Sequence, residues 1–132
     1  MPGPCLCTTL RAAARRLTAS YDAALEPAGI SVAQFSLLRS IGRAAPLSLT
    51  VLGKMVELDR STVGRNVRVI ERMGLVRITH GPDQREATMA LTGQGVDVVR
   101  QALPLWEQAQ RGIEASLGPA ATGQLAVLLD AL

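Results

Sequence analysis

Residues 49–91, LTVLGKMVELDRSTVGRNVRVIERMGLVRITHGPDQREATMAL, decide the fold of this chain. When residues 61–72 are placed on a helix at 100° per residue, the polar and basic side chains collect on one narrow stripe. This stripe consists of Ser61, Arg65, Arg68 and Arg72. The opposite side carries three apolar residues, Val63, Val67 and Ile70. One face of this helix can therefore pack into a core while the other presents guanidinium groups outward.

The flanking residues predict where this helix begins and ends. Asp59 is a suitable N-cap, because its carboxylate can accept from the open backbone N–H groups of the first turn. Gly74 suits the position just after the last turn. A shorter helix precedes it, since Leu52 and Val56 are apolar at i and i+4. After it come two short, partly alternating runs, VRITHG and EATMAL, and the turn-forming GPDQ between them predicts a β-hairpin.

A helix, a short turn, a basic helix and a hairpin together make a winged helix-turn-helix. Such a layout suits DNA, because an α-helix fits the major groove and the preceding helix braces it across the backbone. The charge distribution favours the same interpretation. Seven basic and four acidic residues lie between positions 54 and 85, a surplus that equals the net charge of +3 of the whole chain. The alternative is a solvated helix face, the usual fate of a charge run.

The same residues resemble the multiple-antibiotic-resistance-regulator (MarR) family of bacterial transcription factors. The resemblance rests on LDRSTVGRNVRVIERMGLV, on Asp83 and Arg85 in a D-x-R pattern, and on the LTGQG that follows. It extends more weakly over nearly the whole chain. It implies a two-fold homodimer whose recognition helices enter successive major grooves of double-stranded DNA. It also implies that Arg85 enters the minor groove and that Asp83 orients this arginine.

Length and composition limit the class of protein. A chain of 132 residues predicts one domain with a real core. Hydrophobic residues make up 48% and aromatic residues only 2%, so Ala, Leu and Val must fill an interior of packed helices. No run approaches the ~18 apolar residues of a membrane span. The N-terminus lacks the order of segments expected of a secretion signal. We therefore expect a cytoplasmic protein without a membrane partner.

Four further helices are predicted around the central stretch. Apolar positions at three- and four-residue spacing predict a long helix over residues 5–25. Ser31 and Gln34 form a capping box at the start of a helix that ends at Arg43. Thr92 is the expected N-cap of a helix over 93–117, in which Pro104 removes a backbone hydrogen bond and should cause a kink. A closing helix spans 120–132, and residues 47–49 are expected to add a small third strand beside the hairpin.

The first helix and the last two carry apolar stripes with little globular core to receive them. Such stripes are typical of an obligate dimer, in which each protomer covers the other; the alternative is a monomer that folds them onto its own body. We predict a mainly α fold with a small β-wing. Residues 1–31 would form an N-terminal dimerisation helix, 32–91 the winged helix-turn-helix DNA-binding lobe, and 92–132 the C-terminal dimerisation helices.

The candidate DNA-binding residues lie on the basic helix and around it. Ser61, Thr62 and Arg65 are near its N-terminal end, the part that reaches base edges. Arginine can bond guanine O6 and N7 bidentately, whereas Ser and Thr are less selective. Arg68 and Arg72 lie further along and are predicted to contact phosphates. The remaining candidates are Lys54, Asn66, Arg77 and Arg85.

Signatures of catalysis and of metal binding are missing from the sequence. It contains no GxSxG, P-loop or HExxH motif. The GxG at Gly93 and Gly95 lacks the third glycine of a dinucleotide site. The single histidine, His80, has no cysteine or acidic cluster at ligand spacing, and we interpret it as a wing residue near phosphates. We therefore predict no enzyme, no metal site and no cofactor.

Cys5 and Cys7 form a C-x-C pair at the start of the first helix. The pair spans too little backbone for an easy mutual disulfide but could hold a thiophilic ion. A helix N-terminus also lowers the pKa of a thiol and favours the reactive thiolate. One hypothesis is a sensor of oxidant, Cu(I) or arsenite that cysteines of the partner subunit complete. The alternative is that two small side chains pack at the dimer interface.

A small-molecule effector is a further partner that the resemblance implies. Members of the MarR family often bind small aromatic acids between the dimerisation region and the DNA-binding lobe. In this sequence Tyr21, Phe35 and Trp106 are the side chains that could stack on such a ligand.

The functional hypothesis is a homodimeric MarR-type transcriptional regulator. It would be a repressor that binds a pseudo-palindromic operator and is released by a small effector or by thiol modification. The alternative is a winged helix used as a protein-interaction module without sequence-specific DNA binding. Such a module would not need arginines at positions 65, 68 and 72.

Overall fold

The structure, a computed structural model, describes residues 3–82 and 87–132. The helices, in chain order, are α1 (Leu6–Leu25), the short 3-10 helix η1 (Glu26–Ala28), α2 (Val32–Ala44), α3 (Leu49–Val56), α4 (Arg60–Arg72), α5 (Gly93–Leu117) and α6 (Pro119–Asp130). The strands are β1 (Leu47–Ser48), β2 (Val76–His80) and β3 (Ala87–Leu91). The mainly α fold with a small β-wing is therefore confirmed.

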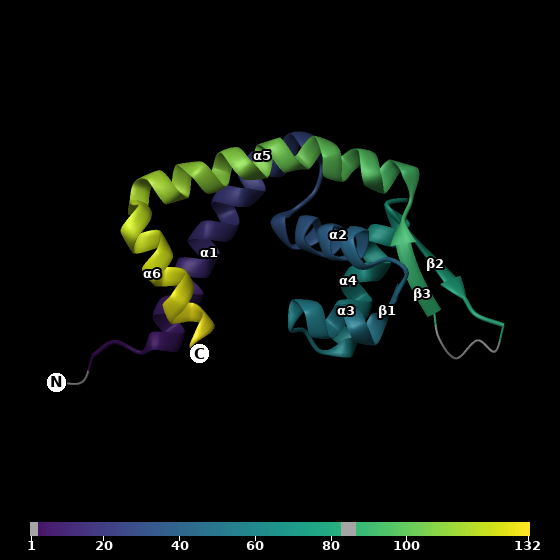
Figure 1. Ribbon diagram of the computed structural model, residues 1–132, viewed down its shortest axis with the longest axis horizontal. Coiled ribbons are helices and arrows are strands. Elements are labelled where there is room, and N and C mark those ends of the chain that lie inside the picture. Colours follow the sequence, from purple (N-terminus) through teal and green to yellow (C-terminus); the bar gives the residue numbers. More distant parts are fainter. Residues whose placement is uncertain (1–2, 83–86) are drawn as a thin grey trace.

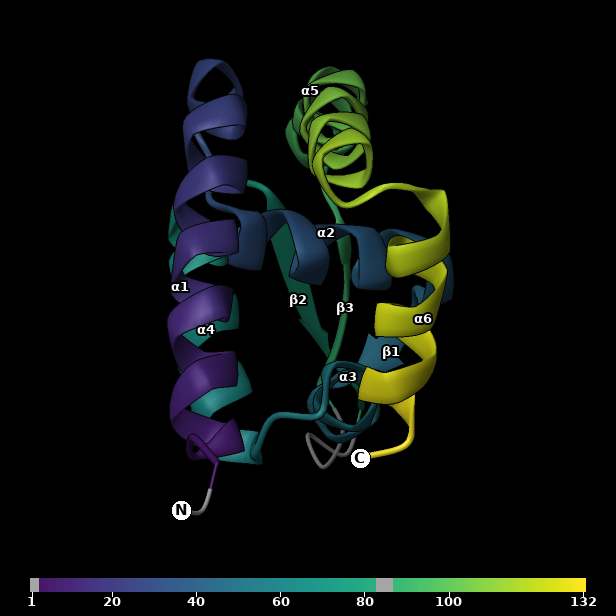
Figure 2. The ribbon, with the colours of Figure 1, turned by 90° about the vertical axis from the view of Figure 1, so that its left-hand side faces the viewer.

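Helix α5 joins two parts of the molecule (Figure 1). At its N-terminal end lie α2, α3, α4 and the sheet, which we call the lobe. At its C-terminal end α1 and α6 descend from the level of α5. Figure 2 shows these two helices as separate columns on either side of the view. Both contact α5: the C-terminal part of α1 meets the middle of α5, and α6 follows the end of α5 (Figure 1). Two layers of helices thus extend away from the lobe.

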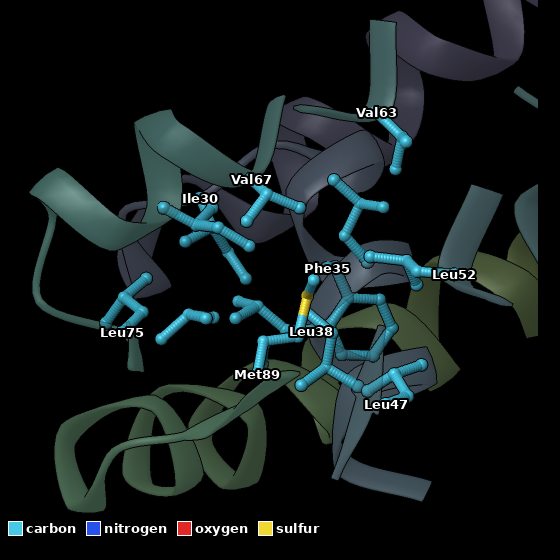
Figure 3. Close-up of a cluster of buried hydrophobic side chains, with 14 of the residues drawn as sticks. Ile30, Phe35, Leu38, Leu47, Leu52, Val63, Val67, Leu75 and Met89 are labelled. Atoms are coloured by element: carbon cyan, nitrogen blue, oxygen red, sulfur yellow. The ribbon is translucent and has the colours of Figure 1, made fainter. Parts of the chain in front are cut away.

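The hydrophobic core lies in the lobe (Figure 3). Helix α2 contributes Phe35 and Leu38, α3 contributes Leu52, and β3 contributes Met89, all at most 3% exposed. The predicted inner face of α4 is confirmed as fully buried or nearly so: Val63, Val67 and Ile70. Each such side chain stabilises the fold by roughly 1.5–3 kcal/mol relative to exposure. The apolar face of α4 is therefore anchored, which leaves its polar face outside.

The three strands form one antiparallel sheet in the order β1-β3-β2. Leu47 lies opposite Met89, and Val76 lies opposite Leu91. The predicted hairpin and the predicted third strand are both confirmed. The predicted turn GPDQ covers residues 81–84, and its last two residues, 83 and 84, lie outside the described residues. The sheet closes the lobe beside α4, because β2 follows α4 after only a short turn.

The predicted N-caps are confirmed at three helix starts. Ser31 Oγ accepts from the Gln34 N–H at 3.1 Å, and the Ser31 N–H donates to Gln34 Oε1 at 3.0 Å. Asp59 accepts from the Thr62 N–H at 2.8 Å. Thr92 Oγ1 accepts from the Gly95 N–H at 3.0 Å. Local hydrogen-bonding groups therefore fix where α2, α4 and α5 begin.

Two backbone details concern α5, which has the predicted bounds, and the end of α3. Helix α5 continues through Pro104 to Leu117 and is bowed but unbroken (Figure 1). Glu57, at the end of α3, has a φ of 55° in the left-handed region, where glycine is the usual residue. Its N–H still donates to the Gly53 carbonyl and closes the helix.

The apolar stripes of the outer helices face solvent in the single chain. Leu6 of α1 is 71% exposed, and in and after α6 Leu128 and Leu132 are 66% and 88% exposed. Isolated exposed leucines are common, but a row on adjacent helices marks a contact surface. None of the described helices has both the length and the apolar character needed to cross a bilayer.

Candidate nucleic-acid interface

Helix α4 presents a basic face that its own sequence orients. Ser61, Arg65, Arg68 and Arg72 are all exposed, on the side opposite the buried valines. At its C-terminal end the Gly74 N–H donates to Glu71 O and the Leu75 N–H to Ile70 O. These two bonds, with Gly74 at a φ of 80°, make a Schellman motif. The helix is thus closed at both ends and displays a straight row of guanidinium groups.

The N-terminal turn of α4 contains a small hydrogen-bonded network. Asp59 Oδ1 accepts from the Thr62 N–H at 2.8 Å and from Ser61 Oγ at 2.9 Å. The Thr62 backbone bond is the largest cause that lowers the pKa of Asp59, followed by the Ser61 bond, while nearby Arg65 adds a smaller effect. Arg65 Nη2 lies 3.4 Å from Thr62 Oγ1. The network holds Ser61 and Thr62 beside the guanidinium group of Arg65.

A second basic region lies where α3 meets the start of α4. Lys54 is exposed and lines a surface hollow of about 350 Å³ together with Thr50, Glu57 and Arg60. Lys54 was among the predicted residues, whereas Thr50 and Arg60 were not. The place of Arg60, directly after the N-cap Asp59, was a signal in the sequence that could have identified it. Glu57 introduces one negative charge among these cations.

Asn66 is the helix residue of the predicted set that lies farthest from the basic stripe. It lines a small pocket of about 140 Å³ with Ser31, Gln34 and Leu37, beside the start of α2. A step of 100° per residue places it about 140° from Ser61 around the helix. The structure therefore does not bring Asn66 together with the arginines.

The wing is described only in its strands. Arg77 is exposed on β2, opposite Ala90, and His80 is exposed at the end of β2. Asp83 and Arg85 lie outside the described residues. Of the cations predicted in the hairpin, Arg77 and Arg85, the structure thus describes Arg77 and places it on the outer surface of the hairpin.

The two cysteines lie at the beginning of α1, far along the chain from the lobe. Cys5 is the N-cap residue, Cys7 is in the first turn, and both are exposed free thiols. Hydrogen bonds lower the pKa of Cys5, first from the Thr8 side chain and then from the Thr8 and Cys7 backbone. Within the described ranges, no group of three or more His, Cys, Asp or Glu side chains could hold a metal ion.

The only Tyr, Phe and Trp of the chain meet where α1, α2 and α5 come together. Tyr21 stacks on Trp106 with 6.3 Å between ring centroids, and Phe35 lies 6.0 Å from Trp106 on the other side. The Tyr21 hydroxyl donates to Gln110 of α5. Burial, and to a lesser extent the Glu114 carboxylate, raise the pKa of Tyr21, so this hydroxyl remains a donor.

Two arginines lie against this aromatic cluster. The Arg39 guanidinium carbon is 5.4 Å from the Trp106 centroid and 5.6 Å from that of Phe35, which is cation–π distance. Arg39 and Arg43 line a hollow of about 220 Å³ with Phe35, Trp106 and two serines. A planar anion could stack there and bond to guanidinium groups.

The lobe combines a short helix α3 anchored by buried Leu52, an exposed basic helix with caps at both ends, and a hairpin. These features define the chain as a winged helix-turn-helix protein with a surface for nucleic acid. Residues 28–86 match the model of the MarR family. The transcriptional regulator MosR of M. tuberculosis, solved in complex with DNA, is 37% identical to this chain. That match covers 97% of this chain and 96% of the other, with a TM-score of 0.85. The chain belongs to the MarR family of transcriptional regulators.

More distant solved structures share the same fold. A cysteine-to-serine mutant of MarR from E. coli, complexed with operator DNA, is 23% identical over 95% of this chain and 91% of that chain, with a TM-score of 0.86. BpsR of Bordetella bronchiseptica, whose DNA binding is regulated by 6-hydroxynicotinic acid, is 24% identical over 98% and 96%, also with a TM-score of 0.86. No curated protein sequence matches the chain.

Proposed function

We propose that this protein is a homodimeric, DNA-binding repressor that recognises a pseudo-palindromic operator. The observation that carries the proposal is the exposed row of Arg65, Arg68 and Arg72 on a helix whose other face is anchored in the core. A helix of this kind fits the major groove. MosR, a relative of similar length and 37% identity, was solved in complex with DNA.

The proposed contacts divide into base readers and phosphate contacts. Ser61, Thr62 and Arg65 would reach base edges from the N-terminal end of α4. The phosphate contacts would come from further along α4, from α3 and from the hairpin: Arg68, Arg72, Lys54 and Arg77. Family resemblance adds Arg85 in the minor groove, oriented by Asp83. Asn66, at the margin of this surface, is the remaining proposed DNA contact.

Residues 1–31 and 92–132 are proposed to form the dimerisation region, and 32–91 the DNA-binding lobe. A groove of about 790 Å³ between α1, α5 and α6 is lined mainly by apolar side chains such as Leu17, Ile113 and Leu125. Helices of a second copy would fill this groove and cover the exposed leucines. The two-fold axis would then place the two α4 helices about 34–36 Å apart, one turn of DNA.

Release from the operator is proposed to come from an effector or from thiol modification. The effector would be a small aromatic anion in the hollow beside Arg39 and Trp106, between the lobe and α5. Oxidant, Cu(I) or arsenite would act at Cys5 and Cys7, because an exposed thiol with a lowered pKa is reactive. Either event would alter the separation of the two lobes.

No catalytic activity is proposed, and a regulator of chromosomal DNA is expected in the cytoplasm of a bacterium. The rival function is a protein-interaction module built on the winged helix. The two differ in their salt dependence, since binding through phosphates weakens steeply as salt rises.

The test is selection of DNA by the purified dimer from fragments of its own genome, followed by sequencing. The wild type should enrich a small set of fragments that share a pseudo-palindrome. A variant with Arg65→Ala, Arg68→Ala and Arg72→Ala should retain its fold and lose the enrichment. Equal enrichment by the two proteins, or none by the wild type, would reject the proposal.

Regulation is tested on one selected duplex. Oxidant or arsenite should weaken binding by the wild type, reversibly with dithiol, and should not affect a Cys5→Ser, Cys7→Ser variant. Benzoate serves as the probe for the hollow. It should quench or shift the emission of Trp106, the only tryptophan, and Arg39→Gln should abolish this change. A response that survives these substitutions would place the sensor elsewhere.

A further inference from the structure

The end of α4 and the beginning of α5 meet in a joint built from backbone groups. Thr92, the N-cap of α5, donates its N–H to the Leu75 carbonyl at 3.0 Å. Its hydroxyl donates to the Gly74 carbonyl at 2.6 Å and accepts from the Gly95 N–H at 3.0 Å. Gly74 and Leu75 are also the residues that close α4. The last turn of the recognition helix and the first turn of α5 therefore share one hydrogen-bonded junction.

Gly95 brings the two helices closer than any other residue type would allow. It is buried, and a Cβ built on it would lie 2.0 Å from the Leu75 carbonyl oxygen and 3.0 Å from the carbonyl carbon. Ordinary contact begins at about 3.4 Å, so a methyl group would force the two elements apart by at least 1.4 Å. The obstacle is backbone, which cannot rotate away as a side chain can. Gly93 lies two positions before Gly95 in the same turn, and a Cβ built on it would have nothing within 4 Å.

The joint matters because of what lies on each side of it. Helix α5 is one continuous helix from the joint to the groove proposed for the partner subunit. Helix α4 carries the basic row, and its last residues are fixed to the same joint. The atoms that would meet a Cβ at Gly95 are all backbone atoms of Leu75. A change of angle at Gly95 must therefore move α4 relative to the dimerisation helices.

We infer that Gly95 is a positioning residue for operator binding. By holding the first turn of α5 against the Leu75 carbonyl, it sets the orientation of α4 relative to the two-fold axis. It thereby sets the distance between the two basic helices of the dimer. Gly95 touches no DNA in this scheme. The inference rests on the proposed function for its consequence, but its geometric part can be tested without DNA.

The first experiment measures the distance between the two α4 helices by pulsed electron paramagnetic resonance. Cys5 and Cys7 are the only cysteines, so a Cys5→Ser, Cys7→Ser background allows one spin label per subunit at an exposed position of α4, Glu71→Cys. Adding Gly95→Ala should shift or broaden the distance distribution by up to about 3 Å, because the two-fold axis doubles the displacement of 1.4 Å. Adding Gly93→Ala, the matched control, should leave it unchanged.

The second experiment compares duplexes that carry one or two half-sites of the selected operator. The Gly95→Ala dimer should bind a single half-site within about twofold of the wild type, since each α4 is intact. Its affinity for the full operator should fall at least tenfold, because the half-sites no longer match the helix spacing. A uniform loss on both duplexes would instead indicate a merely structural role and overturn the inference.

If Gly95→Ala does not fold, Thr92→Val replaces it as a milder variant. Valine keeps the shape but lacks the hydroxyl that joins Gly74 to Gly95, so it should give a smaller change of the same kind. A distance distribution identical to the wild type in a folded, dimeric Gly95→Ala or Thr92→Val protein would refute the inference. A wild type that binds no DNA would reject the proposed function and leave the distance measurement standing.

Discussion

Replacement of Arg72 by alanine tests the proposed phosphate contacts through their salt dependence. Arg72 is exposed at the end of the basic row. Across residues 3–82 and 87–132, the single ion pair is between Asp97 and Arg100, so no acidic group there occupies the Arg72 guanidinium. Each phosphate contact adds about 0.9 to the slope of log affinity against log salt. Because the dimer carries two copies, Arg72→Ala should flatten the slope by about 1.8.

This difference in slope gives a measurable ratio. When KCl rises from about 50 to 200 mM, the affinity of Arg72→Ala for DNA should fall by a factor that is roughly 12-fold smaller than the factor for the wild type. The affinities would be measured by fluorescence anisotropy on one labelled duplex at several salt concentrations. Arg100→Ala, which removes an exposed arginine of α5 outside the proposed DNA contacts, is the control and should keep the wild-type slope. If the lines for Arg72→Ala and the wild type are parallel, Arg72 does not contact phosphate.

Four further outcomes follow from the same structure. Arg65→Ala should relax base preference at a cost of about 1–3 kcal/mol per half-site, and an unchanged ratio of affinities for cognate and scrambled duplexes would exclude Arg65 as a base reader. Leu128→Glu with Leu132→Glu should dissociate the dimer in light scattering, because unpaired charges would enter the apolar seam; a wild type that is monomeric at micromolar concentration would contradict this. Glu57→Gly should raise the free energy of unfolding by up to about 1 kcal/mol by relieving the positive φ, whereas Glu57→Ala, which keeps a Cβ, should not. Hydrogen bonds lower the pKa of Asp59 in the folded state, so the ionised carboxylate should stabilise the fold fully above the ordinary carboxyl pKa. This stabilisation should disappear as pH falls through the lowered pKa. Urea midpoints of the wild type and Asp59→Asn should therefore converge in acid, and a constant difference would disprove the linkage.

Most of the fold was accessible from the sequence, because the rules that set it are local. The inner face of α4 follows from helical spacing, and its start follows from the hydrogen-bonding capacity of Asp59. The same holds for the capping box at Ser31. Strand β1 was predicted from a run of only three residues next to the hairpin. In the caps and the helical face the decisive groups follow one another at spacings of three or four positions, whereas β1 pairs with β3 about 40 residues later.

The contacts between distant segments had no comparable signal. Asp22 of α1 accepts the Val32 N–H at 2.7 Å and so ties the outer helix to the start of α2. Nothing in the sequence joins these two positions, because the bond depends on the path of η1 between them. The close approach of Gly95 to Leu75 is also non-local, and the GxG pattern suggested only an incomplete nucleotide motif. The left-handed conformation of Glu57 could not be foreseen, since the residue that usually signals it is glycine.

The candidate site was predicted from one helix and from three isolated aromatic residues. The row of arginines was predicted in full, because exposure follows from the helical wheel once the core face is known. Asn66 was also predicted, and on the same wheel it lies at the margin of this row, toward the start of α2. Tyr21, Phe35 and Trp106 were named as the side chains that could stack on a ligand. In the structure Tyr21 stacks on Trp106, Phe35 lies tilted against Trp106, and a hollow lined by Phe35, Trp106 and Arg39 adjoins the cluster.

Helix α5 links the regions proposed for DNA binding, effector binding and dimerisation. Gly95 lies at its joint with α4, and Trp106 contacts the lobe eleven residues later, about 16 Å along the axis. The groove proposed for the partner subunit begins at Leu105 and continues to Leu117. An anion beside Trp106 would therefore act between the fixed joint and the dimer seam, where a small change in packing alters the angle between them. The anion can favour release only if it binds the displaced arrangement more tightly than the DNA-binding arrangement. A tenfold difference between these two affinities would shift the equilibrium by about 1.4 kcal/mol. The cysteines lie at the far end of α1 and would act on the seam without involving this segment of α5.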